Sequence, residues 1–555
     1  MVAKDQACLH RDKACHGDAC PLARGFYDRL PGARDAAVAD GWMDEAALRR
    51  IALEHHVCPY YLGQELLRWA DVVVGDVHHL FDSNGQLWSL TQAEEWRLSV
   101  LVDEAHNLID RVRRMYSAEL QLGLLRVAMT LAPLPMRGRF DVLLHEAQTL
   151  TEAHVHAEGQ AVDCAVVDAV PEPLISALRA LNAALGEHFQ HHPTAVGALL
   201  NAYFQLLRFE RLVDTFGEHS LFQVQRMEGQ PDAPASGTET WLGDDAEGIS
   251  SRARALTGHN GPTAGTASAC DVALAIRNVV PARFMRLRLK GVHTVTLLSA
   301  TLGPPRYQCD LLGLPEDTDW IDVPSFFLAE NFVVRTAAHL STRLPHRQKT
   351  LRALTDVIAG QFDAQPGNYL AFFSSFAYLD QVADSLRARR PDIAQWRQGK
   401  GMDGAARLEF LQRFIPEGVG IGFAVLGGVF AEGVDLPGTR LIGAFIATLG
   451  LPPVSATQDQ TRARLDKLFG QGNGYADLVP AMQKVVQAAG RVVRSPEDRG
   501  WLWLLDDRYE RDEVIALLPQ SWGLDRQAPA QGAVCLRARS SAKGRSQPSV
   551  ALRLA

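Results

Sequence analysis

The sequence predicts an α/β protein with two parallel-sheet domains, and three observations support that fold class. Short apolar runs that end in polar residues, such as Leu98–Val102 and Val292–Leu298, are typical of buried parallel strands. Between about residues 330 and 515, similar runs alternate with helical segments. A stretch with leucine-rich helical periodicity, from about 111 to 280, separates the two sets of strands. At 555 residues, the chain is long enough for three or four domains with their own cores.

The N-terminal region predicts a helix followed by the first strands. The helix is expected over Asp44–Trp69, because Asp44 is a favourable N-cap residue and good helix formers follow it. Two short apolar runs come next, Val72–Val74 and Leu98–Val102, and both are interpreted as buried strands. The second run leads directly into Asp103-Glu104-Ala105-His106.

The rest of the chain predicts a helical insertion, a second α/β domain and a tail. The insertion includes a loop rich in Gly, Asp, Ser and Thr at about 229–268. From Arg526 onward the composition changes to Gln, Ala, Pro, Gly and Ser with scattered Arg and Lys, which predicts a mobile basic tail. The strands of the second domain are expected at Tyr369–Phe373, Ile421–Leu426, Leu441–Ala447 and Trp501–Leu505.

Composition limits the functional classes. No apolar stretch of about 18 residues occurs and the N-terminus lacks the apolar core of a signal peptide, so neither membrane insertion nor secretion is supported. We therefore expect a cytoplasmic protein. The net charge of −8 argues against wholesale coating of nucleic acid, but a local basic groove can bind phosphates in an acidic protein.

Four of the eight cysteines fall within the first 58 residues: Cys8, Cys15, Cys20 and Cys58. Six, four and thirty-seven residues separate them in turn. In a reducing compartment such a cluster of cysteines is more typical of a metal site than of disulfide bonds. Four thiolates can ligate a [4Fe–4S] cluster or a tetrahedral zinc ion, and the spacing alone does not distinguish these two.

The tetrapeptide after the strand Leu98–Val102 contains the first candidate catalytic residues. A carboxylate at the carboxyl end of a parallel strand can hold Mg²⁺ on a nucleotide, and a second one beside it can activate the attacking water. Asp103 is the candidate magnesium ligand and Glu104 the candidate base, and His106 completes the candidate catalytic group. The alternative is a solvated turn between a strand and a helix.

Two further segments contain candidate nucleotide-binding residues. Ser299 and Thr301 offer hydroxyl groups at the end of a strand, where they can relay the nucleotide state, although a simple Ser/Thr cap is the alternative. Farther on, a glycine-rich segment allows the backbone to approach a phosphate closely. Within it, Gly433 is a candidate for that approach, and Glu432 and Asp435 can reach ribose, water or a neighbouring domain.

Two arginines near the C-terminus are the candidate phosphate-charge stabilisers. Gln487, Arg491 and Arg494 have the spacing i, i+4 and i+7, which would place them on one face of a helix. An arginine supplied across a cleft stabilises the charge of phosphoryl transfer by about 10³ to 10⁵ in rate. A solvated helix face is the alternative.

Taken in order, these segments resemble motifs II to VI of the XPD/DinG helicases of superfamily 2. The ordered set comprises Asp103-Glu104-Ala105-His106, Ser299-Ala300-Thr301, Phe372-Phe373-Ser374-Ser375, the glycine-rich segment 427–435 and the segment 487–494. The resemblance implies two RecA-like motor domains, an iron–sulfur domain and a helical arch. It also favours a [4Fe–4S] cluster, because Cys58 is followed by Pro59-Tyr60, as the last cluster cysteine commonly is in that family.

The resemblance assigns the following expected domains: an iron–sulfur domain at 1–65, a partial first RecA-like domain at 66–110 and 281–325, a helical arch at 111–280, a second RecA-like domain at 326–520 and a mobile basic tail at 521–555. For DNA contacts, basic residues precede the strand at Val292. They are Arg283, Arg286, Arg288 and Lys290, which either face a phosphate track or lie on a solvated charged element.

The phosphate-binding pattern G-x-x-x-x-G-K-[ST] does not occur in the sequence. In the resembled family this loop precedes the cysteines, so we expect an N-terminally truncated form of a longer protein with an incomplete first motor domain. We also expect this chain to hydrolyse ATP poorly alone, because the candidate catalytic residues have no loop to anchor the β- and γ-phosphates.

The resemblance implies an ATP-dependent DNA helicase that uses ATP and Mg²⁺, moves 5′ to 3′ on single-stranded or forked DNA and acts in DNA repair. We expect no membrane association and favour a monomer. The alternative is a non-catalytic iron–sulfur or zinc nucleic-acid-binding protein on a helicase scaffold. The upstream gene sequence would discriminate the two.

Overall fold

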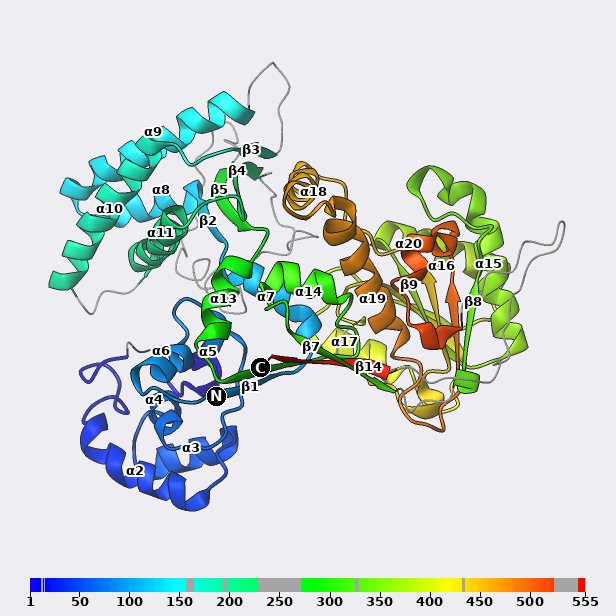
Figure 1. Cartoon of the computed structure of the whole chain (residues 1–555), viewed down its shortest axis with the longest axis horizontal. Helices are drawn as coiled ribbons and strands as arrows, with labels where there is room; N and C mark the ends of the chain where they lie inside the picture. Colours follow the sequence, from blue (N-terminus) through cyan, green and yellow to red (C-terminus); the bar gives the residue numbers. More distant parts are fainter. Residues whose placement is uncertain are drawn as a thin grey trace. The chain divides into compact units, whose positions relative to one another are not determined.

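The computed structural model divides into two compact units (Figure 1). Unit 1 comprises Met1–Leu98, Asp110–Pro231 and Thr240–Val292, and unit 2 comprises Ser99–Ile109, Asp232–Glu239 and His293–Ala555. The residues that the structure describes are 1–10, 13, 15–155, 164–192, 197–227, 271–324, 329–431, 435–523 and 548–554.

Unit 1 begins with a bundle of short helices. Asp44 caps α3, since its side chain accepts a hydrogen bond of 2.8 Å from the backbone N–H of Ala47, so the predicted start is confirmed. The predicted helix nevertheless ends at Glu54, and a second helix begins at Pro59, whose missing N–H suits a first helical turn. The elements are α1 (Lys4–Ala7), α2 (Phe26–Asp40), α3 (Glu45–Glu54), α4 (Pro59–Glu65) and η1 (Leu66–Arg68).

The segment after this bundle differs from the prediction. Val72 and Val74 lie in a loop and are 80% and 74% exposed, so the predicted buried strand at Val72–Val74 is wrong. A run of three apolar residues has strand propensity, but it forms a strand only where a partner strand is available. Two short helices follow, α5 (His78–Phe81) and α6 (Gln86–Ala93).

The rest of unit 1 combines helices with an antiparallel sheet (Figure 1). Its order is β2-β5-β4-β3, and buried residues such as Leu120, Phe222 and Ile276 lie on its strands. The predicted helices are present, but the sequence interpretation missed this sheet. The elements are α7 (Leu108–Met115), β2 (Ala118–Gln121), α8 (Leu122–Leu131), α9 (Leu134–Val155), β3 (Cys164–Val167), α10 (Glu172–His191), α11 (Ala198–Asp214), β4 (Ser220–Met227), β5 (Asp271–Asn278) and α13 (Ala282–Lys290).

Unit 2 contains two sheets, the first of which has the order β1-β6-β14-β7. The predicted strands β1 (Ser99–Val102) and β6 (Thr294–Leu298) are present and pair in parallel. The prediction that the first of them is buried is wrong, because β1 lies at the edge of the sheet and Leu101 is 73% exposed. Because β1 and β6 run in the same direction, the segments that follow these two strands lie at the same edge of the sheet. Helix α14 (Pro305–Leu312) leads to β7 (Asp319–Pro324).

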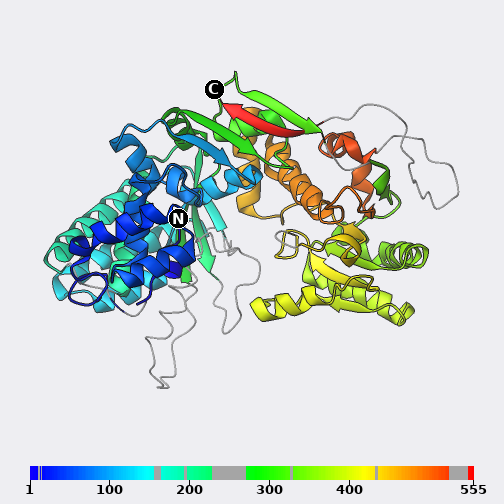
Figure 2. The same cartoon turned by 90° about the horizontal axis from the view of Figure 1, so that it is seen from below.

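The prediction of a mobile tail is wrong for the last described residues of the chain. Residues 548–554 form β14 (Pro548–Leu554), which lies antiparallel between β6 and β7 (Figure 2). The segment 524–547 of the predicted tail lies outside the described residues.

The second sheet of unit 2 has six parallel strands in the order β10-β11-β9-β12-β13-β8, which confirms the second α/β domain. Every residue of β9 is buried, as the apolar run predicts. The strands are β8 (Phe332–Thr336), β9 (Asn368–Phe373), β10 (Gln395–Arg397), β11 (Gly420–Val425), β12 (Gly443–Ala447) and β13 (Gly500–Leu504). The longer helices are α15 (Arg347–Ala364), α16 (Phe376–Arg389), α17 (Gly404–Gln412), α18 (Ala456–Phe469) and α19 (Val479–Ala489), and the short π-helix η7 (Gly474–Leu478) directly precedes α19.

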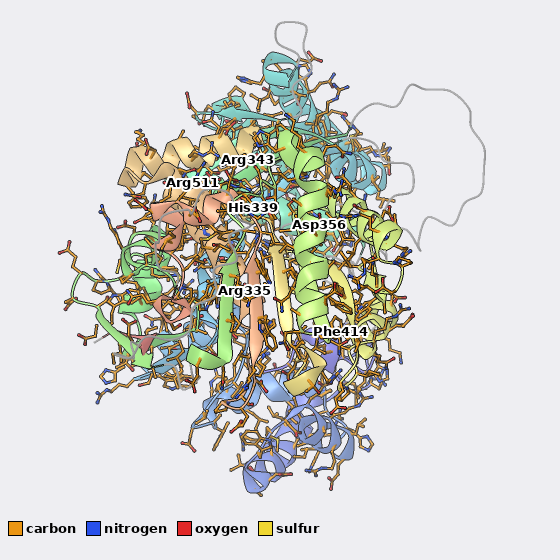
Figure 3. All side chains as sticks on the ribbon, turned by 90° about the vertical axis from the view of Figure 1, so that its right-hand side faces the viewer. Arg335, His339, Arg343, Asp356, Phe414 and Arg511 are labelled. Atoms are coloured by element: carbon orange, nitrogen blue, oxygen red, sulfur yellow. The ribbon has the colours of Figure 1, made fainter. Side chains whose placement is uncertain are left out.

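The edge strand β8 is joined to the rest of this domain by polar contacts. Arg335 on β8 donates a hydrogen bond of 3.2 Å to the side chain of Gln361, and Asp356 lies on the same neighbouring helix, α15 (Figure 3). The indole N–H of Trp503 donates to the same Gln361 oxygen at 2.8 Å. Gln361 therefore links β8, α15 and β13 inside the core.

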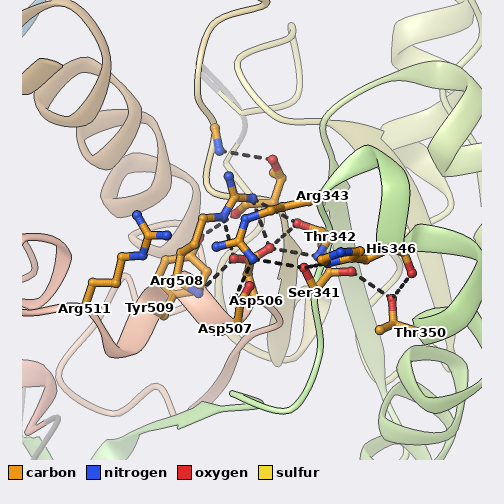
Figure 4. Close-up of polar contacts among 12 residues, drawn as sticks. Ser341, Thr342, Arg343, His346, Thr350, Asp506, Asp507, Arg508, Tyr509 and Arg511 are labelled. Carbon is orange, nitrogen blue, oxygen red and sulfur yellow. Dashed lines mark hydrogen bonds and ion pairs between the residues drawn. The ribbon is translucent and has the colours of Figure 1, made fainter.

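A buried carboxylate joins the loop after β8 to the end of β13 (Figure 4). Asp506 is fully buried and accepts hydrogen bonds from the backbone N–H of Thr342 at 2.9 Å and from Nε of Arg508 at 2.6 Å. Burial disfavours its charge, but the hydrogen bonds from Arg508 and Thr342 outweigh that effect and hold the pKa of Asp506 at about 2. Beside it, Arg343 pairs with Asp507 at 2.7 Å.

No helix among the described residues is long and apolar enough to cross a lipid bilayer.

Candidate active site

The two acidic candidates lie where β1 ends. Asp103 and Glu104 follow the strand directly, and both are exposed, so a ligand can reach their carboxylates. The backbone N–H of Glu104 donates a hydrogen bond of 2.8 Å to the Asp103 carboxylate. Glu104 has a φ of +46°, in the left-handed region that residues other than glycine seldom adopt. Such backbone strain is often found at functional sites.

His106 connects this edge to two other candidate segments. Its side chain is only 7% exposed. Nδ1 lies 2.8 Å from Oγ of Ser299, and 3.2 Å from a carboxylate oxygen of Glu104. Nε2 contacts the side-chain amide nitrogen of Gln487. With the Gln487 amide in this orientation, Nε2 is the acceptor and the ring proton lies on Nδ1, directed at Ser299 and Glu104.

The segment after β6 is held by the same helix, α19. Oγ of Ser299 accepts a hydrogen bond of 3.0 Å from the backbone N–H of Thr301. One turn before Gln487, Gln483 donates to the backbone carbonyls of Thr301 and Leu302 at 3.2 and 3.3 Å. Sequence analysis missed Gln483, although its i, i+4 spacing from Gln487 was a usable signal. The hydroxyl of Thr301 is buried and has no hydrogen-bond partner within the described part of the chain.

The two candidate arginines are not on a helix face, which corrects the prediction. Helix α19 ends at Ala489, so only Gln487 of the three predicted residues is helical. Glycine follows as the C-cap residue, and glycine is a poor helix former that commonly ends helices. Arg491 and Arg494 instead lie in the irregular segment beyond the helix.

Both arginines nevertheless reach the predicted glycine-rich segment. Nε of Arg491 donates to the backbone carbonyl of Ala431 at 3.3 Å, and Nε of Arg494 lies 3.8 Å from the carboxylate of Asp435. The structure thus brings three of the predicted site residues into this region. Glu432 and Gly433, also predicted here, lie outside the described residues.

The four N-terminal cysteines are all unpaired thiols in unit 1. Cys58 is the N-cap residue of α4, and its side chain makes no capping hydrogen bond. Burial raises the pKa of the Cys58 thiol, and the nearby Cys20 and Cys8 raise it further. Three of the thiols are therefore neighbours, but within the described ranges no three His, Cys, Asp or Glu side chains are arranged to hold a metal ion.

Two family models match separate parts of the chain. A family model described as Helicase C-terminal domain matches residues 358–524, and the model DEAD_2 matches residues 2–125. These two segments contain the acidic edge and the arginine segment described above.

Several curated proteins are similar over much of the chain. A probable ATP-dependent helicase of Methanocaldococcus jannaschii is 22% identical over 74% of this chain and 65% of its own length. The ATP-dependent helicase DinG of Mycobacterium tuberculosis is 28% identical over 49% of this chain and 42% of its own length. The chain therefore spans about two thirds or less of the length of these relatives.

Solved structures support the fold. A structure described as XPD helicase matches with a TM-score of 0.55 and 16% identity, over 95% of this chain and 85% of that one. The structure of Xpd4 from S. tokodaii matches with a TM-score of 0.51 and 14% identity, over 88% and 90% of the two chains. The predicted mixed α/β fold with RecA-like domains agrees with both. Its ordered motifs, its two matching domain models and its fold together show that the chain belongs to the XPD/DinG-type helicases of superfamily 2.

Proposed function

We propose that this protein is an ATP-dependent DNA helicase, which couples ATP hydrolysis to movement along single-stranded DNA and to duplex unwinding. The observation that carries this proposal is the position of His106. It contacts Glu104 at the acidic edge, Ser299 after β6 and Gln487 on α19. These are segments that a motor must couple, and the relatives named above are ATP-dependent helicases.

The exposed carboxylates fit the binding of Mg²⁺-ATP. Mg²⁺ is commonly held by one or two carboxylates together with substrate phosphates, and it neutralises charge on the phosphoryl oxygens. In this proposal, Asp103 is the magnesium ligand and Glu104 orients and deprotonates the attacking water. The strained backbone at Glu104 fixes the direction of its side chain beside that of Asp103.

The remaining candidates act on the phosphate charge and on coupling. Arg491 and Arg494 stabilise the negative charge of phosphoryl transfer, and Glu432, Gly433 and Asp435 contribute to the neighbouring nucleotide contacts. His106 positions Glu104, and Ser299, Thr301 and Gln487 transmit its position to the second α/β domain.

A second candidate function is favoured by one sequence observation, the absence of the G-x-x-x-x-G-K-[ST] pattern from these 555 residues. Backbone amides and a lysine in that loop normally hold the β- and γ-phosphates. The second candidate is therefore a nucleic-acid-binding protein on the helicase scaffold that does not turn over ATP.

We also propose that Cys8, Cys15, Cys20 and Cys58 ligate a [4Fe–4S] cluster. Support comes from the proximity of Cys8 and Cys20 to Cys58, because both thiols raise the pKa of the Cys58 thiol. Zinc is the alternative ligand, since it accepts the same four thiolates.

The expected partner is single-stranded or forked DNA, and the expected setting is DNA repair by a monomer in the cytoplasm. The 5′ to 3′ direction rests on the family resemblance.

The test is DNA-stimulated ATP hydrolysis. It uses the 555-residue chain and the same chain preceded by any in-frame sequence that the gene carries upstream of Met1. Turnover that requires DNA, and that falls when Glu104→Gln is introduced, is the expected result for a motor. If the gene encodes no phosphate-binding loop and neither protein hydrolyses ATP, the motor proposal fails and the binding protein is favoured.

A further inference from the structure

Unit 1 contains a cavity that none of the proposed catalytic residues lines. Its volume is about 630 Å³, within the range of about 300–1,000 Å³ that is typical of small-ligand pockets. It is bounded by α6, α11, α13, the end of α7 and the loop 82–84. All of its lining residues belong to unit 1, so the cavity is complete within that unit.

The cavity is strongly cationic. Four basic side chains line it, namely Arg208, Arg211, Arg288 and Lys290, against one carboxylate, Asp82. Asp82 is engaged locally, because it accepts hydrogen bonds from the backbone N–H of Asn84 at 2.9 Å and from the hydroxyl of Ser83 at 3.3 Å.

The three arginines are held by neutral acceptors. Arg208 donates to the backbone carbonyls of Arg114 and Met115 at 3.0 and 3.2 Å. Arg211 donates to the side-chain oxygen of Asn84 at 2.7 Å, and Arg288 donates to the backbone carbonyl of Asp82 at 2.9 Å.

No carboxylate therefore neutralises these groups by an ion pair within the part of the chain that the structure describes. Elsewhere the same chain pairs arginine with acid, as where Arg390 contacts both Asp363 and Asp392. The surrounding protein lowers the pKa of Arg208 by desolvation, although its side chain remains accessible from the cavity. An anion in the cavity would relieve this unfavourable concentration of positive charge.

Aromatic surface lies beside the cations. Phe284 stacks on Tyr116 with ring centroids 3.9 Å apart, and Trp88 packs against the guanidinium of Arg288 at 4.4 Å. A glycine at position 291 allows the position of Trp88, because a Cβ on Gly291 would lie 2.1 Å from the indole ring. Aromatic side chains interleaved with cations are the combination that binds a base and its phosphate.

We propose that this cavity binds a nucleotide unit, with its phosphate held by Arg211 and Lys290 and its base against the aromatic surface. The unit belongs either to a single strand of nucleic acid or to a free nucleotide. In the first case the inference rests on the proposed helicase function and adds a strand contact to it. Of the basic residues on α13, Arg288 and Lys290 line the cavity, whereas Arg286 does not.

The test measures binding without ATP. A labelled oligodeoxythymidine is titrated with wild-type chain, with Lys290→Glu and with Arg211→Glu at several salt concentrations. Each variant is expected to weaken binding by at least about tenfold and to reduce the salt slope by about 0.7 per lost phosphate contact. Arg286→Glu is the matched control, because it reverses the same charge at an exposed position of the same helix outside the cavity, and it should keep most of the affinity.

Thermal melting verifies that the variants fold. If Arg211→Glu does not fold, Lys290→Glu carries the test, because its side chain makes no hydrogen bond or ion pair to the described residues. Thymidine monophosphate is titrated in parallel. Cavity-dependent binding of the monophosphate identifies a free nucleotide as the ligand, and cavity-dependent binding of the oligonucleotide alone identifies a strand.

The proposal is overturned if wild-type chain binds neither probe, if both cavity variants bind like wild type, or if Arg286→Glu weakens binding as much as Lys290→Glu. Because no ATP is present, failure of the motor proposal does not change this result. Conversely, if neither probe binds in the cavity, the ATP hydrolysis test can still support the motor proposal.

Discussion

Nδ1 of His106 lies 2.8 Å from Oγ of Ser299, although the two positions are 193 apart in the sequence. On the other side of the imidazole, Nε2 contacts Gln487 of α19. Both ring nitrogens are thus engaged, and the ring is nearly buried. A side chain held at both nitrogens has a fixed orientation. A shift of α19 would therefore move His106 and, through it, change the position of Glu104.

The first prediction concerns this contact. In the form of the protein that hydrolyses ATP, Gln487→Ala should lower kcat by about 100-fold, because loss of the contact misplaces His106 and Glu104. The KM for ATP and the affinity for DNA should change little, since Gln487 touches neither ligand in this proposal. Steady-state kinetics and DNA titration measure the two effects separately.

Gln483→Ala is the matched control for that variant. Gln483 lies one turn earlier on the same helix and contacts only backbone carbonyls of the segment after β6. A smaller loss of kcat is expected from it. Equal losses in both variants would mean that α19 matters only as a packed helix, and would remove the positioning role of His106.

The second prediction concerns the arginine segment. Arg491→Ala should lower DNA-stimulated turnover by about 10³-fold, the lower end of the effect of an arginine on phosphoryl transfer. Arg499→Ala, an exposed arginine shortly after this segment, is the control and should leave turnover near wild type. If the two variants lose activity equally, the arginine acts through the stability of the segment, which a thermal melt would show.

The third prediction concerns the N-terminal cysteines. Anaerobically purified chain should contain iron and sulfide and show the visible absorbance of an iron–sulfur cluster. Cys58→Ser should lose both. Cys309→Ser should retain them, although Cys309 is a free thiol of similar accessibility in unit 2. A colourless wild-type chain that contains zinc would support the zinc alternative, and a chain without either metal would contradict both.

Much of unit 2 was predictable because strand signals are local. The runs that became β6, β9, β11, β12 and β13 are apolar, and each also has a parallel partner in the fold. Val72–Val74 has a similar pattern but lies in an exposed loop. Propensity alone does not provide a partner strand.

The candidate site was predictable in composition but not in geometry. The acidic residues and arginines could be found by motif, whereas the contact of His106 with Gln487 depends on how α19 packs against the strand ends. The helix face assumed for Arg491 and Arg494 failed because the helix ends at Ala489. The cavity of unit 1 could not be inferred from sequence, since α11 and α13 meet only in the folded chain.

The fourth prediction concerns stability and pH at Asp506. Its pKa of about 2 in the folded protein lies below the usual value of 3.8. A carboxylate with a lowered pKa stabilises the fold above its unfolded pKa, and this contribution is lost as the pH falls through the folded pKa. The difference corresponds to about 2 kcal/mol at pH 7 and to about half of that at pH 3. Asp506→Asn should therefore lower the free energy of unfolding at pH 7, and its deficit relative to wild type should shrink toward pH 3.

Asp507→Asn provides the comparison for Asp506→Asn, because Asp507 is the adjacent acid, is 35% exposed and pairs with Arg343 at 2.7 Å. A partly exposed pair contributes only about 0–1 kcal/mol, so this variant should lose little stability. Urea unfolding of wild type and both variants between about pH 3 and 7 measures the two deficits. A deficit for Asp506→Asn that stays constant over this range would show that its cost comes from packing and neutral hydrogen bonds. The charge held between Thr342 and Arg508 would then contribute nothing to joining the loop after β8 to the end of β13.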